Sequence, residues 1–210
     1  MNRAAGKIEP RYTWDDYRQW PDDERWELIE GVAYAMTPSP ASRHQTMQME
    51  MSRQMANFFR NHRCRPFAAP MDVKLSDEDV VQPDILVVCN RKQIKPTHIE
   101  GAPALVVEIL SPSSQEHDRI RKTRLYARAG VKEFWIVTPL PSSVEVLVLD
   151  GKTYRLQAVY GKDEVLASAR FPELKLHLAE VFDFPLEPGE EIQMVREGHP
   201  PYAASNAKAK

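Results

Sequence analysis

The segment 104–138 constrains the fold most, because two strongly apolar runs flank an amphipathic stretch within it. The first run, ALVVEIL at 104–110, and the last, EFWIVT at 133–138, are almost continuously apolar, which is typical of strands covered on both faces. Residues 115–129 between them have helical periodicity, and Gly130 follows where a helix usually ends. This order predicts a right-handed parallel strand–helix–strand unit.

Other strands extend this unit into a larger sheet. The run ILVVC at 85–89 predicts another buried strand, and RWELIEGVAYAM at 25–36 predicts two short strands around a glycine. Asp150-Gly151 predicts a hairpin between 144–149 and 154–160 that continues the sheet antiparallel. We therefore expect an α/β fold with a mixed central β-sheet flanked by helices and a C-terminal β-hairpin extension.

Two helices are expected in the first third of the chain. Thr13, followed by two aspartates in a first turn, predicts a short helix that reaches about Trp20. Ser42 is expected to cap a second helix over about 43–61. Its apolar residues recur at a spacing of four and form a core-facing stripe: Met47, Met51, Met55 and Phe58 or Phe59.

Length and composition indicate one folded domain, expected over 13–185 between flexible ends at 1–12 and 186–210. The chain has 210 residues, 42% of them hydrophobic, which is enough for a core. With 28 Lys and Arg against 30 Asp and Glu, the net charge of −2 excludes a histone-like polycation. A local basic face for nucleic acid remains compatible with this balance.

The same composition indicates a cytoplasmic protein without a membrane segment. The longest apolar run, 85–89, is far shorter than the ~20 residues that span a bilayer. The start of the chain, MNRAAGKIEP, lacks the apolar core of a signal peptide. Two cysteines make no disulfide framework, which favours a reducing compartment.

Two acidic residues stand where apolar strands are expected. Asp84 follows Pro83 at the entry to the 85–89 strand, where a turn or cap role is the simpler interpretation. Glu108 lies inside ALVVEIL, and a glutamate is rarely buried without a partner. An edge-strand charge or a structural ion pair competes with a metal ligand or a general base at Glu108.

Lys122 belongs to the inner face of the helix predicted at 115–129. It shares a face with Asp118 at a spacing of four, and that stripe continues through Leu125 and Ala129. The ammonium of Lys122 is therefore expected near Glu108, with Asp118 as a candidate to orient it. A surface salt bridge is the competing interpretation.

These groups together predict a metal-dependent hydrolytic site. Two neighbouring carboxylates repel each other, and a divalent cation with oxygen ligands, Mg²⁺ or Mn²⁺, relieves that repulsion. Such a cation activates water and neutralises charge on a phosphate. A nearby lysine adds positive charge for the attacking water and the transition state.

The chain resembles the PD-(D/E)XK nuclease superfamily, with its restriction-endonuclease-like core, and more narrowly the Uma-two family of bacterial endonucleases. The matching segments are ELIEG, SPASRH, QPDILVV, VVEILSPSS, DRIRK and YARAGVKEFWIV, in this order between about 13 and 182. The resemblance implies Mg²⁺-dependent hydrolysis of phosphodiester bonds, nucleic acid and above all DNA as the partner, and a homodimer.

The resemblance also implies roles for individual residues. Asp84 and Glu108 become metal ligands, with the carbonyl of Ile109 as a third candidate. Glu27 corresponds to an auxiliary acid, for which Glu30 competes. The resemblance further marks His44 as a recurring histidine, either a structural cap or an accessory phosphate contact.

One position departs from the superfamily pattern. The lysine expected two residues after the glutamate is Leu110 here. The resemblance places the substitute lysine on the following helix, at Lys122, which agrees with the inner-face argument. Thr138 stands where the family often has an acid, and we assign it no role.

Other classes of site lack the necessary residues. A His117-Asp118 phosphohydrolase requires a helical bundle, which the strand content opposes. Cys64 and Cys89 are expected to be isolated and have no paired spacing for zinc. The sequence holds no GxSxG elbow, dinucleotide fingerprint or Walker loop.

Two basic stretches are candidates for phosphate contacts. One runs from Arg119 to Lys132, and the other from Arg53 to Arg65. A solvated helix face is the simpler interpretation, since acidic residues dilute the first stretch. Should both border one cleft, they would give salt-sensitive affinity for nucleic acid.

Two hypotheses therefore stand. The first is a metal-dependent endonuclease that uses Asp84, Glu108 and Lys122, assisted by Glu27 and His44. The second is a non-catalytic nucleic-acid-binding or assembly module on the same fold, because fold alone does not fix function.

Overall fold

The computed structural model describes residues 10–21, 24–36, 41–111 and 115–185, without the side chains of 115–118. Two mixed sheets, a two-stranded antiparallel sheet, four α-helices and a short 3-10 helix form this part of the chain. The segments 1–9 and 186–210, which the sequence predicts to be flexible, lie outside the described residues. Tyr12, inside the predicted N-terminal tail, donates a backbone hydrogen bond to the Gly31 carbonyl.

The larger sheet has six strands in the order β11-β10-β9-β8-β6-β3. Its strands β8 (Leu105–Ile109) and β9 (Glu133–Thr138) are parallel, and α3 (Gln115–Ala129) lies between them in sequence, which confirms the predicted parallel strand–helix–strand order. Its other neighbours pair antiparallel. The remaining strands are β3 (Arg65–Ala68), β6 (Ile85–Val88), β10 (Ser143–Asp150) and β11 (Thr153–Gly161).

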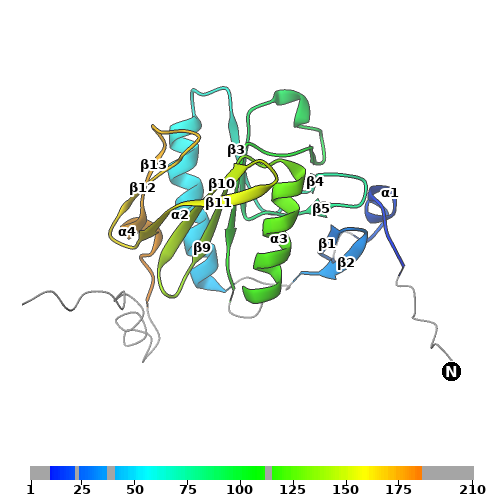
Figure 1. Ribbon diagram of the computed structural model, residues 1–210, viewed down its shortest axis with the longest axis horizontal. Helices are drawn as coiled ribbons and strands as arrows, with labels where there is room; N and C mark the ends of the chain where they lie inside the picture. The colour runs from blue at the N-terminus through cyan, green and yellow to red at the C-terminus, as the bar shows by residue number, and fades with distance from the viewer. Residues whose placement is uncertain (1–9, 22–23, 37–40, 112–114, 186–210) are drawn as a thin grey trace, which may run out of the picture.

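Alternation along the strands places a helix on each face of this sheet. Ile85, Leu105 and Val107 pack with the methionine stripe of α2 (Ser42–Phe59), while their neighbours Leu86 and Val106 pack with α3. Figure 1 shows the sheet with α2 and α3 beside it. Both faces of the central strands are therefore buried, which explains their continuous apolar sequence. The mixed α/β architecture matches the expected fold class.

The smaller sheet has five strands in the order β2-β1-β5-β4-β7, and its first hairpin is the pair of strands predicted around Gly31. The β1–β2 turn uses Glu30 and Gly31, both at positive φ, as a tight hairpin requires. The strands are β1 (Trp26–Ile29), β2 (Val32–Ala35), β4 (Val73–Lys74), β5 (Val80–Val81) and β7 (Ile99–Glu100). Three of them have only two residues, too few to show a sequence period.

Several local predictions need correction. The first helix, α1 (Trp14–Tyr17), ends before Trp20. Ser42 is the first residue of α2, whose N-cap is Ala41. After β11 the chain forms a further hairpin and a short helix, neither of which was predicted. These elements are β12 (Val165–Ala167), β13 (Lys175–His177) and α4 (Leu178–Val181), and η1 (Arg91–Gln93) lies before β7.

The cysteines are paired rather than isolated. Cys64 precedes β3 and Cys89 follows β6, and the antiparallel register that puts Arg65 opposite Val88 brings them together. They form a disulfide across the strand ends. The expectation of isolated cysteines is wrong, and the argument for a reducing compartment loses its basis. Among the helices of the described ranges, none has the length and apolar character to cross a bilayer.

A buried carboxylate anchors the segment after β12 to the central sheet. Glu133, fully buried at the start of β9, accepts hydrogen bonds at both oxygens. Oε1 accepts from Trp135 Nε1 and the Ala169 amide, and Oε2 accepts from the Ser168 hydroxyl and the Arg170 amide. Four donors therefore satisfy a charge that would otherwise oppose folding.

We predict that Glu133→Gln destabilises the fold by about 2–4 kcal/mol. In either orientation, the new amide nitrogen faces two donors, and each unsatisfied buried group costs about 1–3 kcal/mol. Urea denaturation measures the change, and exposed Glu173→Gln is the control for the lost charge. Equal stability of the two variants would contradict the anchoring role.

Candidate active site

Asp84 and Glu108 meet because β6 and β8 are antiparallel neighbours. Ile85 pairs with Val107, so the same register extended by one residue sets Asp84 opposite Glu108. Pro83 lies just before the start of β6, where its lack of an amide hydrogen costs the sheet no hydrogen bond. Strand alternation turns Glu108 toward α3, since Val107 faces α2. Two acids that lie 24 residues apart in the sequence thus become cross-strand neighbours.

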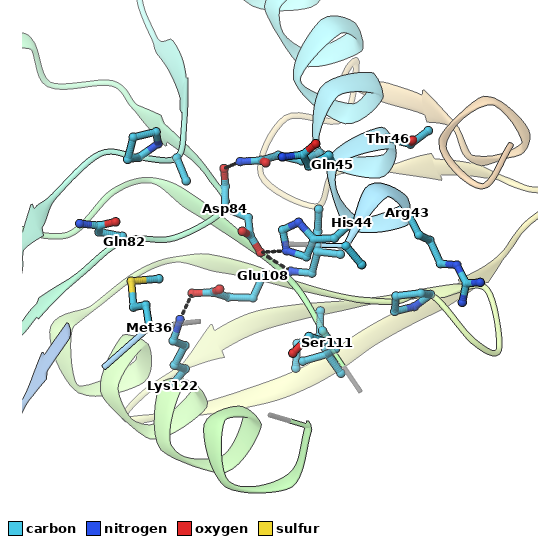
Figure 2. Close-up of a pocket in the computed structure, with 18 of the residues that line it drawn as sticks. Met36, Arg43, His44, Gln45, Thr46, Gln82, Asp84, Glu108, Ser111 and Lys122 are labelled. Atoms are coloured by element: carbon cyan, nitrogen blue, oxygen red, sulfur yellow. Dashed lines mark hydrogen bonds and ion pairs between the residues drawn. The ribbon is translucent and has the colours of Figure 1, made fainter. Parts of the chain in front are cut away.

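The Asp84 carboxylate is held by strand β8 and by helix α2. Its Oδ2 accepts a hydrogen bond from the Ile109 amide at 2.7 Å and lies 3.2 Å from His44 Nε2. Gln48, one turn after His44, donates to the Asp84 carbonyl at 3.0 Å. The first turns of α2 thus fix both ends of this residue, and Figure 2 shows the imidazole and the carboxylate joined.

His44 is largely buried beside this carboxylate. Burial lowers the pKa of the imidazole, but the hydrogen bond and negative charge of Asp84 outweigh it, and the pKa is raised above its usual value. Nδ1 is buried and has no hydrogen-bond partner within the described part of the chain. The raised pKa favours the protonated imidazole, whose positive charge would face Asp84.

Glu108 is buried in the sheet and contacted from α3. Its Oε1 accepts hydrogen bonds from Lys122 Nζ at 3.1 Å and from the Tyr126 hydroxyl. Burial raises the pKa of Glu108 to about 7; the Lys122 ammonium opposes this rise, and the charges of Asp84 and Glu27 add to it. The carboxylate is poised between its two protonation states near neutral pH.

Lys122 connects this pair to the smaller sheet. Its ammonium lies 3.0 Å from Glu27 Oε1 on β1 and 3.1 Å from Glu108 Oε1. Burial would lower the pKa of this lysine, but the two glutamates and Asp84 raise it above its ordinary value. Lys122 therefore stays protonated, with its side chain only 12% exposed.

The structure separates Glu27 from its competitor. Glu27 is buried and also accepts from the Gln82 amide at 3.1 Å, next to the Pro83-Asp84 pair. Glu30 points to the surface, where it pairs with Arg128. Glu27 thus lies in the cluster of charges and Glu30 does not.

The cluster opens into a cavity of about 1050 Å³. Glu27, His44, Asp84, Glu108 and Lys122 all line it. Arg25, Arg43 and Arg119 are further cations on its wall, and Arg119 is bound by Glu145. Within the described residues, no arginine is paired with Asp84 or Glu108, so the space beside them is open to a ligand.

The two acids fit a hard divalent ion that keeps several of its waters. The hydrogen bonds use Oδ2 of Asp84 and Oε1 of Glu108, and the described residues supply no donor to the other oxygen of either group. With Glu27, Asp84 and Glu108 all ionised, their negative charge exceeds the positive charge of Lys122 and His44 together, which favours a bound cation. Mg²⁺ commonly takes one or two carboxylates. In the described ranges, no three His, Cys, Asp or Glu side chains form a complete metal cage.

All five predicted site residues lie together, whereas the two basic stretches do not converge. The residues from Arg53 to Arg65 are absent from the lining of this cavity, and Arg53 is paired with Glu50 and Glu180. The side chain of Asp118 lies outside the described residues. Tyr126 and Gln48 also contact the site and were not predicted from the sequence, although each stands four residues after a predicted site residue, a spacing that shares a helix face.

Comparisons with known proteins bear on the family and the fold. A family model described as "Uma2: Putative restriction endonuclease" matches residues 14–179. The "Uncharacterized protein slr1290" of Synechocystis sp. is 28% identical over 140 residues, which are 65% of this chain and 73% of that protein. A crystal structure of "a putative nuclease belonging to DUF820" from Anabaena variabilis has a TM-score of 0.67 at 22% identity, over 81% of this chain and 97% of that chain. At this identity the structural match establishes the fold.

We predict that Glu108→Gln changes the pH dependence of stability. The folded pKa of about 7 lies above the ordinary 4.5, so protonated Glu108 favours the fold and that contribution is lost as pH rises through this range. Glutamine cannot ionise. At pH 8 without metal, the free energy of unfolding of the variant should therefore exceed that of the parent by about 1–3 kcal/mol. Urea unfolding in EDTA at pH 5 and pH 8 measures it; a constant difference between the two proteins would contradict the raised pKa.

Proposed function

We propose that this chain, which belongs to the Uma2 family, is a divalent-metal-dependent endonuclease that hydrolyses phosphodiester bonds in DNA. The observation that carries the proposal is the cross-strand pair of Asp84 and Glu108 with the buried ammonium of Lys122 beside it. Two acids and an amine at one cavity are the minimal set for this reaction.

Asp84 and Glu108 are the proposed ligands of Mg²⁺ or Mn²⁺, with the Ile109 carbonyl as a third. When bound, the ion would activate water and neutralise charge on the phosphate. The protein prepares for it by holding one oxygen of each acid with its own donors. His44 is proposed to steady Asp84 from the α2 side.

Lys122 is proposed to orient the attacking water and to stabilise negative charge that develops on the phosphate. Its raised pKa keeps the ammonium charged at neutral pH. Glu27, from β1, contacts the ammonium at 3.0 Å and thereby helps to set its position. The lysine thus supplies from a helix the charge that Leu110, two residues after Glu108, does not.

We predict that Asp84→Asn and Lys122→Ala each reduce cleavage of supercoiled plasmid at least about 100-fold, because each removes charge needed at the transition state. Exposed Asp163→Asn is the charge-matched control for Asp84→Asn and should cleave as the parent does. The reaction is followed by gel with Mg²⁺ or Mn²⁺, and EDTA should stop it. Parental rates in both variants would refute the assignment.

The alternative, a non-catalytic module, is separated by calorimetry. Mn²⁺ titration of the parent and of Asp84→Asn should give binding that depends on the aspartate. DNA binding without any metal binding would favour the module instead. The homodimer implied by the family resemblance stays a prediction, which light scattering after gel filtration checks.

A second surface suits the nucleic acid beside the reacting phosphate. A groove of about 300 Å³ runs along α3 and shares Tyr34 with the larger cavity. Arg121, whose guanidinium stacks 4.0 Å from the Tyr34 ring centre, and exposed Arg124 line it. We propose that these arginines contact the DNA backbone, whereas Arg60 and Arg63 line neither space.

We predict that Arg121→Ala/Arg124→Ala lowers DNA affinity and lowers the slope of log affinity against log salt by up to about 2, since each duplex phosphate contact contributes about 0.9. Arg60→Ala/Arg63→Ala removes the same charge on the far end of α2 and should bind as the parent does. Fluorescence anisotropy over a salt series makes the comparison. Equal losses in both double variants would show that only net charge matters.

A further inference from the structure

Tyr126 is a fully buried polar residue at the back of the proposed metal site. It lies on α3 one turn after Lys122, and its hydroxyl donates a hydrogen bond to Glu108 Oε1. Its ring packs against Phe134 with 5.1 Å between ring centres. The ring therefore belongs to the core, and the hydroxyl alone reaches the site.

We infer that Tyr126 is a positioning residue that fixes the Glu108 carboxylate in the orientation needed to bind the divalent ion. This inference rests on the proposed function. Lys122 and Tyr126 converge on the same oxygen, Oε1, from one face of one helix. Rotation of the carboxylate would break both contacts, so Oε2 keeps a fixed direction and stays without a donor from the described residues.

The hydroxyl has no other explanation in the core. Phenylalanine would pack against Phe134 equally well, and a buried hydroxyl costs free energy unless it is paired. The partner of the hydroxyl is the Glu108 carboxylate, and no other hydrogen bond of this hydroxyl is found within the described residues. Groups that orient a metal ligand in this way typically change metal affinity 10–100-fold when removed.

A matched residue in the same core separates this role from simple packing. Tyr154 on β11 also packs against Phe134, with 5.7 Å between ring centres. Its hydroxyl donates to the Val131 carbonyl at 2.8 Å, away from the acids. Tyr154→Phe therefore removes a hydrogen-bonded hydroxyl from the same aromatic cluster without touching the site.

The test is calorimetric titration of Mn²⁺ into the full chain and into the two variants. Tyr126→Phe should weaken Mn²⁺ binding by about 10–100-fold, while Tyr154→Phe should bind as the parent does. Plasmid cleavage gives a second readout. The Mn²⁺ concentration for half-maximal rate should rise in Tyr126→Phe, and excess Mn²⁺ should recover most of the rate.

Other outcomes overturn the inference and can be told apart. Parental Mn²⁺ affinity in Tyr126→Phe, or an equal loss in Tyr154→Phe, would reject Tyr126 as a positioning residue and leave the proposed nuclease intact. A parent that binds no Mn²⁺ would reject the proposed metal site and this inference together. Circular dichroism and urea unfolding confirm that each variant is folded, so a loss of binding in a folded variant is decisive.

Discussion

The antiparallel pairing of β6 with β8 is the constraint on which the site depends. It sets Asp84 opposite Glu108, and the amide of Ile109 then closes on the aspartate. A shift of one residue would turn one acid to the opposite face of the sheet. The apolar residues on both faces oppose such a shift. It would move the residues that pack against α2 to the α3 face, and those that pack against α3 to the α2 face. Core packing and site geometry are therefore the same constraint.

The central unit was predictable because its signals are local. The bounds of α3 and β9 agree with the periodic pattern, and Gly130, at positive φ, ends the helix. The acid at Glu108 could be singled out because a charge inside an apolar strand requires a partner. Its placement near Lys122 followed from the inner helix stripe, and the 3.1 Å contact agrees with it.

The rest of the fold and site depends on contacts between distant segments, which local patterns do not encode. Two-residue strands such as β4 and β5 form only because a neighbour supplies their hydrogen bonds. Glu27 and Glu30 look equivalent in sequence, and the fold separates them, since Glu27 is buried within β1 whereas Glu30 lies in the exposed turn between β1 and β2. Tyr126 was missed because a buried aromatic residue on a helix is expected only to pack in the core. Nothing in the local sequence indicates that its hydroxyl donates a hydrogen bond to Glu108.

Lys122 spans two separate sheets, since Glu27 belongs to the five-stranded one and Glu108 to the six-stranded one. The ammonium therefore links the two sheets through one ion pair with each. Any motion that separates β1 from α3 would break the Lys122–Glu27 ion pair and leave the lysine side chain less well positioned. The position of the lysine in the cavity thus depends on stable packing of the β1–β2 hairpin, which carries Glu27.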